Sequence, residues 1–460
     1  MTLERTLSEL ARACGAPLHG ADRPFAEVSI DTRTLKAGDV FVALRGPRFD
    51  GTEFVGAALE RGAAGALLER AQPLEIAQIV VEDALLALQR AGRAWREACA
   101  IPVVGVAGSN GKTTTKEMTA AILGRAGQCL ATRGNLNNHI GVPLTLLRLE
   151  RAHRSAVIEM GANRAGEVAD LVRLARPTVG LITNAGAEHL EGFGSLEGVA
   201  QAEGEMVAGL APEATAVLNA DDPFFALWRD LTRARVVTFG FAAAADYRAT
   251  DLAASLSAAG FLTRFTLECP LGRTPIELHL GGRHNVTNAL AAAASAASAG
   301  ASLQDIAAGL AAVHPVPGRL QLKQTPGGAW LIDDSYNANP SSVRSGIEVL
   351  ASLAGRRWLV LGDMAELGEY AESAHQQIGE FAREQRIERL YATGPLAALA
   401  VERFGAGARW FPDGEGLTEA LRAALSEAGA GVSVLVKGSR INRLERVVAA
   451  LLADAPPEAH

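Results

Sequence analysis

The sequence predicts an α/β protein of three units, with mostly parallel sheets in the second and third. Apolar runs that suit buried strands alternate with helical patterns over most of the 460 residues. Pro315, Pro317 and Gly318 interrupt this alternation, and we expect a boundary there. A chain of this length can bury two to four cores. We define a first unit (1–84), a second unit (85–313) and a third unit (314–460).

The first unit is predicted to be a small α/β unit. It opens with a helical pattern that places Leu3, Leu7 and Leu10 on one face. Three polar residues, Asp31, Thr32 and Arg33, directly follow a predicted strand. They could line an anion site, because arginine offers a planar fork of donors to phosphate. A solvated turn explains their spacing equally well.

A phosphate-binding loop is predicted near the start of the second unit, after a helix over 84–99. The apolar run Ile101–Val106 indicates a buried strand, and a helical pattern begins at Lys112. Such a corner turns N–H groups and a helix N-terminus toward bound phosphate. Lys112 is expected to reach the β- and γ-phosphates, and Thr113 to ligate Mg²⁺. Because Val106 stands where the strict motif has glycine, an ordinary strand-turn-helix corner is the alternative.

Polar clusters follow further strands of the second unit, where an open parallel sheet binds its ligands. Glu159 ends one apolar run, and His189 and Glu203 lie in later segments. With Thr113 they could hold divalent cations against a triphosphate, although Mg²⁺ prefers oxygen ligands over imidazole. Taken singly, each side chain is more often a surface or capping group.

The rest of the chain continues the α/β pattern with one change. Alternating residues between about 242 and 280 predict an antiparallel edge, and 285–299 predicts a helix. The third unit repeats strand and helix, which predicts a doubly wound, Rossmann-like domain. Its expected strands are 329–332, 358–361, 389–392 and 432–436, and its expected helices are 341–353, 373–385, one ending at 404, and 444–452.

Two polar segments of the third unit follow predicted strands. In Asp333–Pro340, Asn339 and Pro340 are expected to cap and start a helix. An interpretation of Asp333 and Asp334 as the acidic strand end that serves a phosphate loop is less favoured, because a boundary separates them from that loop. The later run Lys437–Arg440 suits an anionic substrate, and a basic turn is its alternative.

Composition limits the classes of function. The apolar share of 48%, the charged share of 21% and the net charge of −7 are ordinary for a globular enzyme and argue against nucleic acid as a partner. The first ten residues have no signal-peptide core, and 285–304 is too weakly apolar for membrane insertion. Four scattered cysteines, without a C-x-x-C, indicate reduced thiols in a cytoplasmic protein.

Together these motifs resemble the Mur ligases, ATP-dependent enzymes that build the peptide of bacterial cell-wall precursors. The family's phosphate loop also lacks the first glycine of the strict motif, which accounts for Val106. The resemblance covers essentially the whole chain, in the ordered segments 31–33, 38–43, 108–113, 134–143, 188–195, 282–285, 333–340, 362–368 and 437–440.

The resemblance implies a UDP-sugar-binding N-terminal domain, a central ATPase and a C-terminal domain that closes over the nucleotide. Within the family, the motifs indicate the branch that adds D-alanyl-D-alanine to UDP-N-acetylmuramoyl-tripeptide through an acyl phosphate. ATP and Mg²⁺ would be the cofactors, and peptidoglycan synthesis, with cell shape and division, the biological context. A cytoplasmic monomer is expected.

The resemblance also implies roles for individual residues. Lys112, Glu159 and His189 would be catalytic, and Thr113, Glu159, His189 and Glu203 would serve the metal. The nucleotide would contact Gly108, Ser109, Asn110, Gly111, Lys112, Thr113, Thr114, Asn285, Asn288, Arg319 and Asp334. Substrates would contact Asp31, Thr32, Arg33, Asn135, Asn137, Asn138, Lys437, Ser439 and Arg440.

One position departs from the family pattern. Where Glu203 stands, members often carry a lysine that reacts with CO₂ to form a metal-binding carbamate. Our hypothesis is that the shorter Glu203 carboxylate replaces the carbamate, either by a small backbone shift or through a bridging water. The alternative is a weakened second metal site, with Glu205 or water in its place.

Two other functions compete with this interpretation. A folylpolyglutamate synthase shares the ATPase core, but the segment 31–46 and the asparagine-rich loop favour a UDP-sugar. A nucleotide switch or motor with a protein partner would release phosphate without small acceptors. A ligase requires both of its acceptor substrates.

Overall fold

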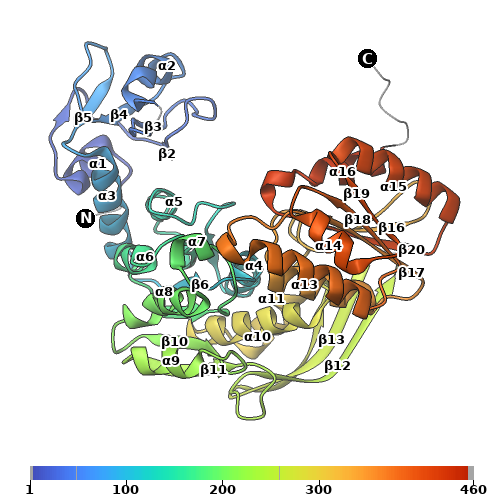
Figure 1. Ribbon diagram of the computed structural model, residues 1–460. Helices are drawn as coiled ribbons and strands as arrows, with labels where there is room; N and C mark the ends of the chain where they lie inside the picture. The colour runs from blue at the N-terminus through green and yellow to red at the C-terminus, as the bar shows by residue number, and fades with distance from the viewer. Residues whose placement is uncertain (1–3, 48, 258–259, 454–460) are drawn as a thin grey trace.

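Figure 1 shows the computed structural model, which describes residues 4–47, 49–257 and 260–453. Within these ranges the strands form four sheets. Leu3, expected on the face of the first helix, lies outside the described residues. Every helix within the described ranges is too short or too polar to cross a lipid bilayer.

The first unit contains a five-stranded sheet in the order β1-β5-β4-β3-β2. Its helix α1 begins after Thr6, whose side chain accepts the Glu9 N–H, and ends at Gly15, whose φ of +75° suits glycine. Leu7 and Leu10 lie on the buried face of this helix. The elements are α1 (Leu7–Cys14), β1 (Leu18–His19), β2 (Val28–Ser29), β3 (Val40–Val42), α2 (Val55–Glu60), β4 (Gly65–Leu68) and β5 (Ala77–Val80).

Helix α3 (Ala84–Glu97) joins the first unit to the second, and Asp83 caps its N-terminus. Its Trp95 is fully buried, with its ring 6.2 Å from that of Phe25. One hydrophobic cluster runs from Leu7 through Trp95 to Ile158 in the next sheet. The two units therefore share a core, and the boundary at residue 84 stays a prediction.

A six-stranded parallel sheet forms the second unit, in the order β11-β10-β9-β6-β8-β7. Strand β6 lies between β8 and β9, so its carboxyl end lies beside the ends of both. The strands are β6 (Val103–Ala107), β7 (Gln128–Ala131), β8 (His153–Glu159), β9 (Val179–Ile182), β10 (Thr215–Asn219) and β11 (Arg235–Phe239). The helices are α4 (Lys112–Leu123), α5 (Gly141–Leu146), α6 (Glu167–Ala175), α7 (Leu190–Phe193), α8 (Leu196–Ala208), α9 (Phe225–Leu231), α10 (Arg283–Ser298) and α11 (Leu303–Ala311).

The segment expected as an antiparallel edge forms a separate sheet instead. Strands β12 (Arg248–Ser257), β13 (Gly260–Cys269) and β14 (Gly272–Leu278) pair antiparallel with one another. Phe265 and Ile276 share a buried cluster with the alanines of α10. The small sheet thus packs its apolar face on that helix, which explains why it is not an edge of the parallel sheet.

The third unit contains a sheet in the order β15-β16-β20-β17-β18-β19, with only β15 antiparallel. Along β17, Leu359 and Leu361 belong to one core, whereas Trp358 and Val360 belong to another. Helices α12–α14 contribute to the first core and α15 and α16 to the second, as a doubly wound domain requires. The elements are β15 (Gln321–Gln324), β16 (Trp330–Asp334), α12 (Pro340–Ala351), β17 (Arg356–Gly362), α13 (Ala371–Glu384), β18 (Arg389–Thr393), α14 (Ala397–Phe404), β19 (Ala408–Phe411), α15 (Gly414–Ala428), β20 (Val432–Lys437) and α16 (Glu445–Leu452).

Candidate functional site

A cavity of about 670 Å³ opens at the carboxyl ends of the second unit's strands, and the third unit supplies its opposite wall. Most of the predicted site residues line it: Ser109, Asn110, Gly111, Lys112, Thr113, Thr114, Asn135, Asn137, Asn138, Glu159, His189, Asn285, Asn288, Arg319, Asp334 and Lys437. The predicted residues outside this lining are Asp31, Thr32, Arg33, Gly108, Glu203, Ser439 and Arg440.

The phosphate loop (residues 108–114) requires glycine at two positions. Gly108 has a φ of +121° and Gly111 a φ of +82°, a region that side chains disfavour. A Cβ on Gly108 would lie 2.1 Å from Thr183 Oγ1, and one on Gly111 would lie 2.3 Å from Asn288 Oδ1. The loop is therefore enclosed on both sides, and its last residues, from Lys112 onward, form the first turn of α4.

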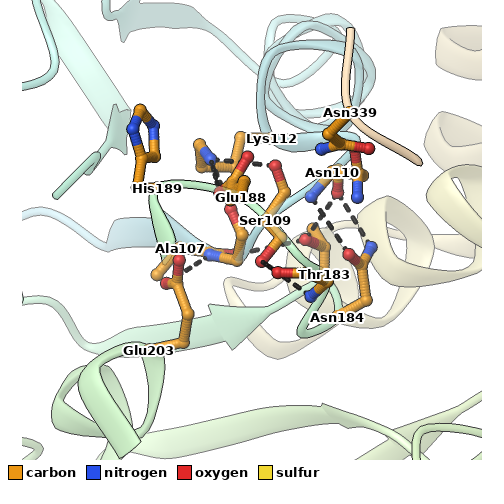
Figure 2. A network of polar contacts seen from close by, with 12 residues as sticks. Ala107, Ser109, Asn110, Lys112, Thr183, Asn184, Glu188, His189, Glu203 and Asn339 are labelled. Atoms are coloured by element: carbon orange, nitrogen blue, oxygen red, sulfur yellow. Dashed lines mark hydrogen bonds and ion pairs between the residues drawn. The ribbon is translucent and has the colours of Figure 1, made fainter. Parts of the chain in front are cut away.

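Side chains that follow β9 hold this loop in place (Figure 2). Thr183 Oγ1 donates to the Asn110 carbonyl at 2.7 Å. Asn184 Oδ1 accepts from the Asn110 N–H at 3.0 Å, while its amide nitrogen donates to the Asn110 carbonyl at 2.9 Å. Ser109 Oγ accepts from the Gly186 N–H at 2.8 Å. The loop is thus preorganised by protein hydrogen bonds.

Lys112 folds back over the loop. Its Nζ donates to the carbonyls of Gly108, at 2.5 Å, and Ser109, at 3.1 Å, and lies 3.3 Å from Glu188 Oε1 (Figure 2). Burial alone would lower the pKa of Lys112, but neighbouring carboxylates, that of Glu188 foremost, outweigh burial and raise it. The side chain is therefore a partly buried ammonium group in the cavity wall.

Glu203 reaches the loop from α8. Its Oε2 accepts the Gly108 N–H at 2.6 Å, and the residue is only 4% exposed. Burial is the main reason that the pKa of its carboxyl rises to about 7. Glu205, the alternative metal ligand, instead accepts the N–H groups of Gly166 and Ala169 at the start of α6. The metal role of Glu203 stays a prediction, while its contact with the loop is observed.

Glu159 presents a carboxylate oxygen that suits a cation. Its Oε1 accepts from Asn137 Nδ2 at 2.9 Å. Its Oε2 has no hydrogen-bond partner among the described residues, and the Nζ of fully buried Lys116 is 3.7 Å away. A buried carboxylate oxygen without a donor is an open ligand position for a hard metal ion.

The other predicted metal ligands contact residues of the third unit. His189 has a φ of +48°, and its Nδ1 lies 2.6 Å from Glu366 Oε2. Thr113 Oγ1 accepts from Arg319 Nη2 at 3.2 Å. Within the described residues, no group of three or more His, Cys, Asp or Glu could hold a metal ion. The residues present fit Mg²⁺ that takes part of its shell from phosphate and water, as Mg²⁺ commonly does.

The nucleotide residues predicted on α10 and beyond the boundary lie on the remaining walls. Asn288 Nδ2 donates to Asn285 Oδ1 at 3.1 Å, which fixes both amides at the start of α10. Arg319 stacks over the Tyr336 ring, 4.6 Å from its centroid. A buried ion pair of 2.5 Å joins Asp334 Oδ2 to Lys437 Nζ, at the ends of the paired strands β16 and β20.

Asn110 forms a direct bridge between the second and third units. Its Nδ2 donates to Ser341 Oγ at 2.9 Å, and its Oδ1 accepts from Asn339 Nδ2 at 2.8 Å. Asn339 also caps α12 by accepting the Ser342 N–H, and Pro340 is the first residue of that helix, which confirms the predicted helix start. The cap thus has a second contact that the sequence alone did not indicate.

Predicted substrate residues of the first unit lie in the turn after β2. Arg33 Nη2 is 2.6 Å from Asp31 Oδ2, and hydrogen bonds from Arg33 lower the pKa of Asp31 to about 2. In the third unit, Ser439 Oγ donates to the Ala338 carbonyl and Arg440 pairs with Glu445. Ala338 lines the cavity, so Ser439 supports the wall from behind, whereas the pair of Arg440 and Glu445 lies outside the lining.

Sequence reasoning missed several titratable residues that contact the site: Lys116, Glu188, His284 and Glu366. Glu188 and His284 stand inside motifs that were recognised, directly beside His189 and Asn285. For Lys116 the available signal was its position one helical turn after Lys112. Glu366 also stands inside a recognised segment, 362–368, but no local pattern indicates its contact with His189.

Comparisons with known proteins define the class of the chain. Its segments match the models of the Mur ligase family catalytic domain over 24–99, the Mur ligase middle domain over 106–296 and the Mur ligase glutamate ligase domain over 318–440. These segments occupy more than half of the chain. The chain therefore belongs to the Mur ligase family.

Particular relatives match it over nearly full length. The chain is 44% identical to the UDP-N-acetylmuramoyl-tripeptide--D-alanyl-D-alanine ligase of Escherichia coli, covering 97% of this chain and 98% of the relative. It is 37% identical to the Bacillus subtilis enzyme of the same name, covering 92% and 93%.

Solved structures agree with this match. The structure of MurF from Acinetobacter baumannii has a TM-score of 0.90 at 34% identity, with 98% and 99% of the chains covered. That of MurF from Thermotoga maritima in complex with ADP has a TM-score of 0.80 at 29% identity, covering 92% and 96%. A folylpolyglutamate synthase from Mycobacterium tuberculosis is 17% identical, with a TM-score of 0.64 and coverage of 81% and 94%, and shares the fold alone.

Proposed function

We propose that this chain is an ATP-dependent ligase that joins D-alanyl-D-alanine to UDP-N-acetylmuramoyl-tripeptide in peptidoglycan precursor synthesis. One observation carries the proposal: the phosphate loop of the second unit faces Arg319 and Lys437 across one cavity, in a chain that matches enzymes of this name over nearly its full length. We expect it to act in the cytoplasm as a monomer.

The first step is transfer of the γ-phosphoryl group of ATP to the terminal carboxylate of the tripeptide, giving an acyl phosphate and ADP. The N–H groups of the phosphate loop and the start of α4 would hold the phosphates. Lys112 would leave the carbonyls of Gly108 and Ser109 and follow the charge that develops during transfer. The residues that would hold Mg²⁺ are Thr113, Glu159, His189 and Glu203. The bound ion would neutralise charge on the phosphates.

The second step forms the amide bond. The amine of D-alanyl-D-alanine attacks the acyl carbonyl, and the tetrahedral intermediate expels phosphate. The acyl phosphate has to be shielded from water, and the bridge from Asn110 to Asn339 and Ser341 supports a closed cavity for this purpose. The cations Arg319 and Lys437 in its wall suit the developing negative charge.

The proposal assigns the UDP-sugar to the turn after β2 and to the asparagine-rich loop, through Asp31, Thr32, Arg33, Asn135, Asn137 and Asn138. The three asparagines line the cavity, and Asn137 also contacts Glu159. The loop thus connects the carboxylate-bearing substrate to the expected metal position. Arg33 would have to share its donors between Asp31 and a substrate phosphate.

Release of inorganic phosphate from ATP tests the proposal. With Mg²⁺ present, UDP-N-acetylmuramoyl-tripeptide and D-alanyl-D-alanine would each be omitted in turn. We expect sustained release only with both substrates, accompanied by the pentapeptide product on mass spectrometry. Sustained release without D-alanyl-D-alanine would contradict the proposal, and release without either substrate would favour a nucleotide switch.

A further inference from the structure

Glu188 is a partly buried carboxylate of the cavity wall, and Lys112 is its close cationic neighbour among the described residues. Its side chain is 12% exposed, and its Oε1 lies 3.3 Å from Lys112 Nζ, in the segment between β9 and α7 (Figure 2). A carboxylate and an ammonium group at this distance attract each other. In the structure, the two charges therefore compensate each other at the edge of the phosphate loop.

Nucleotide binding would disturb this compensation. Lys112 has to turn toward the phosphates, because its present acceptors are the carbonyls of its own loop. The Glu188 carboxylate would then face phosphate oxygens without its partner. Glu159 and Glu203, which also act on Lys112, add charge of the same sign. In a partly dehydrated cavity such repulsion is large unless a cation intervenes.

We propose that Glu188 is a specificity-determining residue that makes nucleotide binding depend on Mg²⁺. Its carboxylate repels the phosphates of metal-free ATP, whereas the divalent cation of the magnesium complex offsets that repulsion. The inference rests on the proposed function, since its ligand is a nucleoside triphosphate. It concerns how the site distinguishes metal-free ATP from its magnesium complex, and it leaves the chemical steps unchanged.

Isothermal titration calorimetry with ATP tests this inference on the full chain without the acceptor substrates. The dissociation constant is measured in EDTA and in saturating Mg²⁺, for the wild type and Glu188→Gln. We expect the ratio of the metal-free to the magnesium-bound constant to fall about tenfold in the variant, as the loss of one charge near the phosphates implies. Binding is the readout, so the result does not depend on turnover.

Two further variants separate charge from packing. Glu188→Asp keeps the carboxylate, and its ratio should stay within about twofold of the wild type. Glu191→Gln removes the same charge from α7, where Glu191 is exposed and outside the cavity lining, and its ratio should also stay unchanged. Thermal unfolding of each unliganded variant shows whether the fold is retained, and Glu188→Ala, which also removes the charge, takes the place of Glu188→Gln if that variant does not fold.

Three results would overturn the inference. The ratio for Glu188→Gln could equal that of the wild type, the ratio for Glu191→Gln could fall as far, or Glu188→Asp could lose the discrimination. Each leaves the ligase proposal intact, because the wild type still binds the magnesium complex. Failure of the wild type to bind ATP even in saturating Mg²⁺ would instead count against the proposed function, and the inference would fall with it.

Discussion

Glu203 combines two contacts whose effects on the site can be separated. Its carboxylate accepts the Gly108 N–H and also adds negative charge beside Lys112. Glutamine preserves an acceptor of similar length but removes the charge, whereas alanine removes both. A comparison of these two substitutions therefore distinguishes support of the phosphate loop from a role in metal binding.

The metal hypothesis predicts that Glu203→Gln needs about tenfold more Mg²⁺ for half-maximal phosphate release. Glu203→Ala should in addition lower the free energy of unfolding by about 1–3 kcal/mol, because the Gly108 N–H is left buried without an acceptor. Magnesium titration of the release rate and urea unfolding measure the two effects. An unchanged magnesium requirement in Glu203→Gln would refute a metal role.

His284 predicts a pH dependence of stability. The side chain is shielded from water in the cavity wall, and this desolvation is the main reason that the pKa of His284 falls from 6.5 to about 4. Asp334 opposes the shift, and Lys437 adds to it. Between these values the unfolded chain binds more protons than the native state, so stability contributed by neutral His284 rises with pH and is complete above 6.5. Urea unfolding of His284→Asn should show a flatter pH profile over this window. If the unfolding free energy of the variant depended on pH as steeply as that of the wild type, this prediction would be wrong.

Local patterns predicted the residues of the phosphate loop but not all of their neighbours. Gly108, Gly111 and Lys112 stand in a contiguous motif between a strand and a helix, which indicates their geometry directly. Glu188 and Lys116 are charged residues, and single charged residues usually face solvent. Lys116 is fully buried and Glu188 partly so, because strands and helices far apart in the chain pack around them, which no local pattern encodes.

At the scale of elements, the predicted helices agree with the observed ones where the hydrophobic periodicity is strong and capping residues are present. The helices expected near 84–99 and 285–299 are observed as Ala84–Glu97 and Arg283–Ser298. Helix α15 was not expected, although Asp413 caps it. The strands over 248–278 were recognised as antiparallel, but their sheet is separate, since packing on α10 rather than alternation determines its position.

The corner between β6 and α4 makes a prediction about glycine. Gly111→Ala should abolish calorimetric ATP binding, because the added methyl group would lie 2.3 Å from Asn288 Oδ1 in a backbone conformation with positive φ. Gly15→Ala is a matched control with similar φ and open space around it. The control should cost about 1–2 kcal/mol of stability and leave ATP binding intact. Normal ATP binding by Gly111→Ala would show that the corner relaxes.

For the whole molecule, contacts between the second and third units connect catalysis to closure. Asn110 bonds to Asn339 and Ser341, Arg319 to Thr113, and His189 pairs with Glu366. All of these contacts surround the cavity rather than stabilise either unit internally. Substitutions at the bridge should therefore shift the opening equilibrium more than the folding equilibrium.

Asn110→Ala removes both bridge contacts and keeps the backbone of the loop. We expect a larger radius of gyration by small-angle X-ray scattering with ATP and Mg²⁺ bound, and kcat about tenfold lower, because open molecules expose the acyl phosphate to water. Ser341→Ala, which removes one of the two contacts, should have a smaller effect. Equal scattering curves and equal kcat for Asn110→Ala and the wild type would show that closure does not need this bridge.

The hydrophobic cluster that runs from Leu7 through Trp95 to Ile158 bears on how such enzymes can be recombined. If the first unit were exchanged between two relatives with a junction at residue 84, the two parts of this core would come from different proteins. Their side chains would not have evolved to pack together. Mismatched volumes there should produce cavities or overpacking. A chimera whose junction lies after α3, and which carries the facing side chains of α5 with it, should retain this interface. Modular exchange in this family is therefore constrained by packing as well as by substrate recognition.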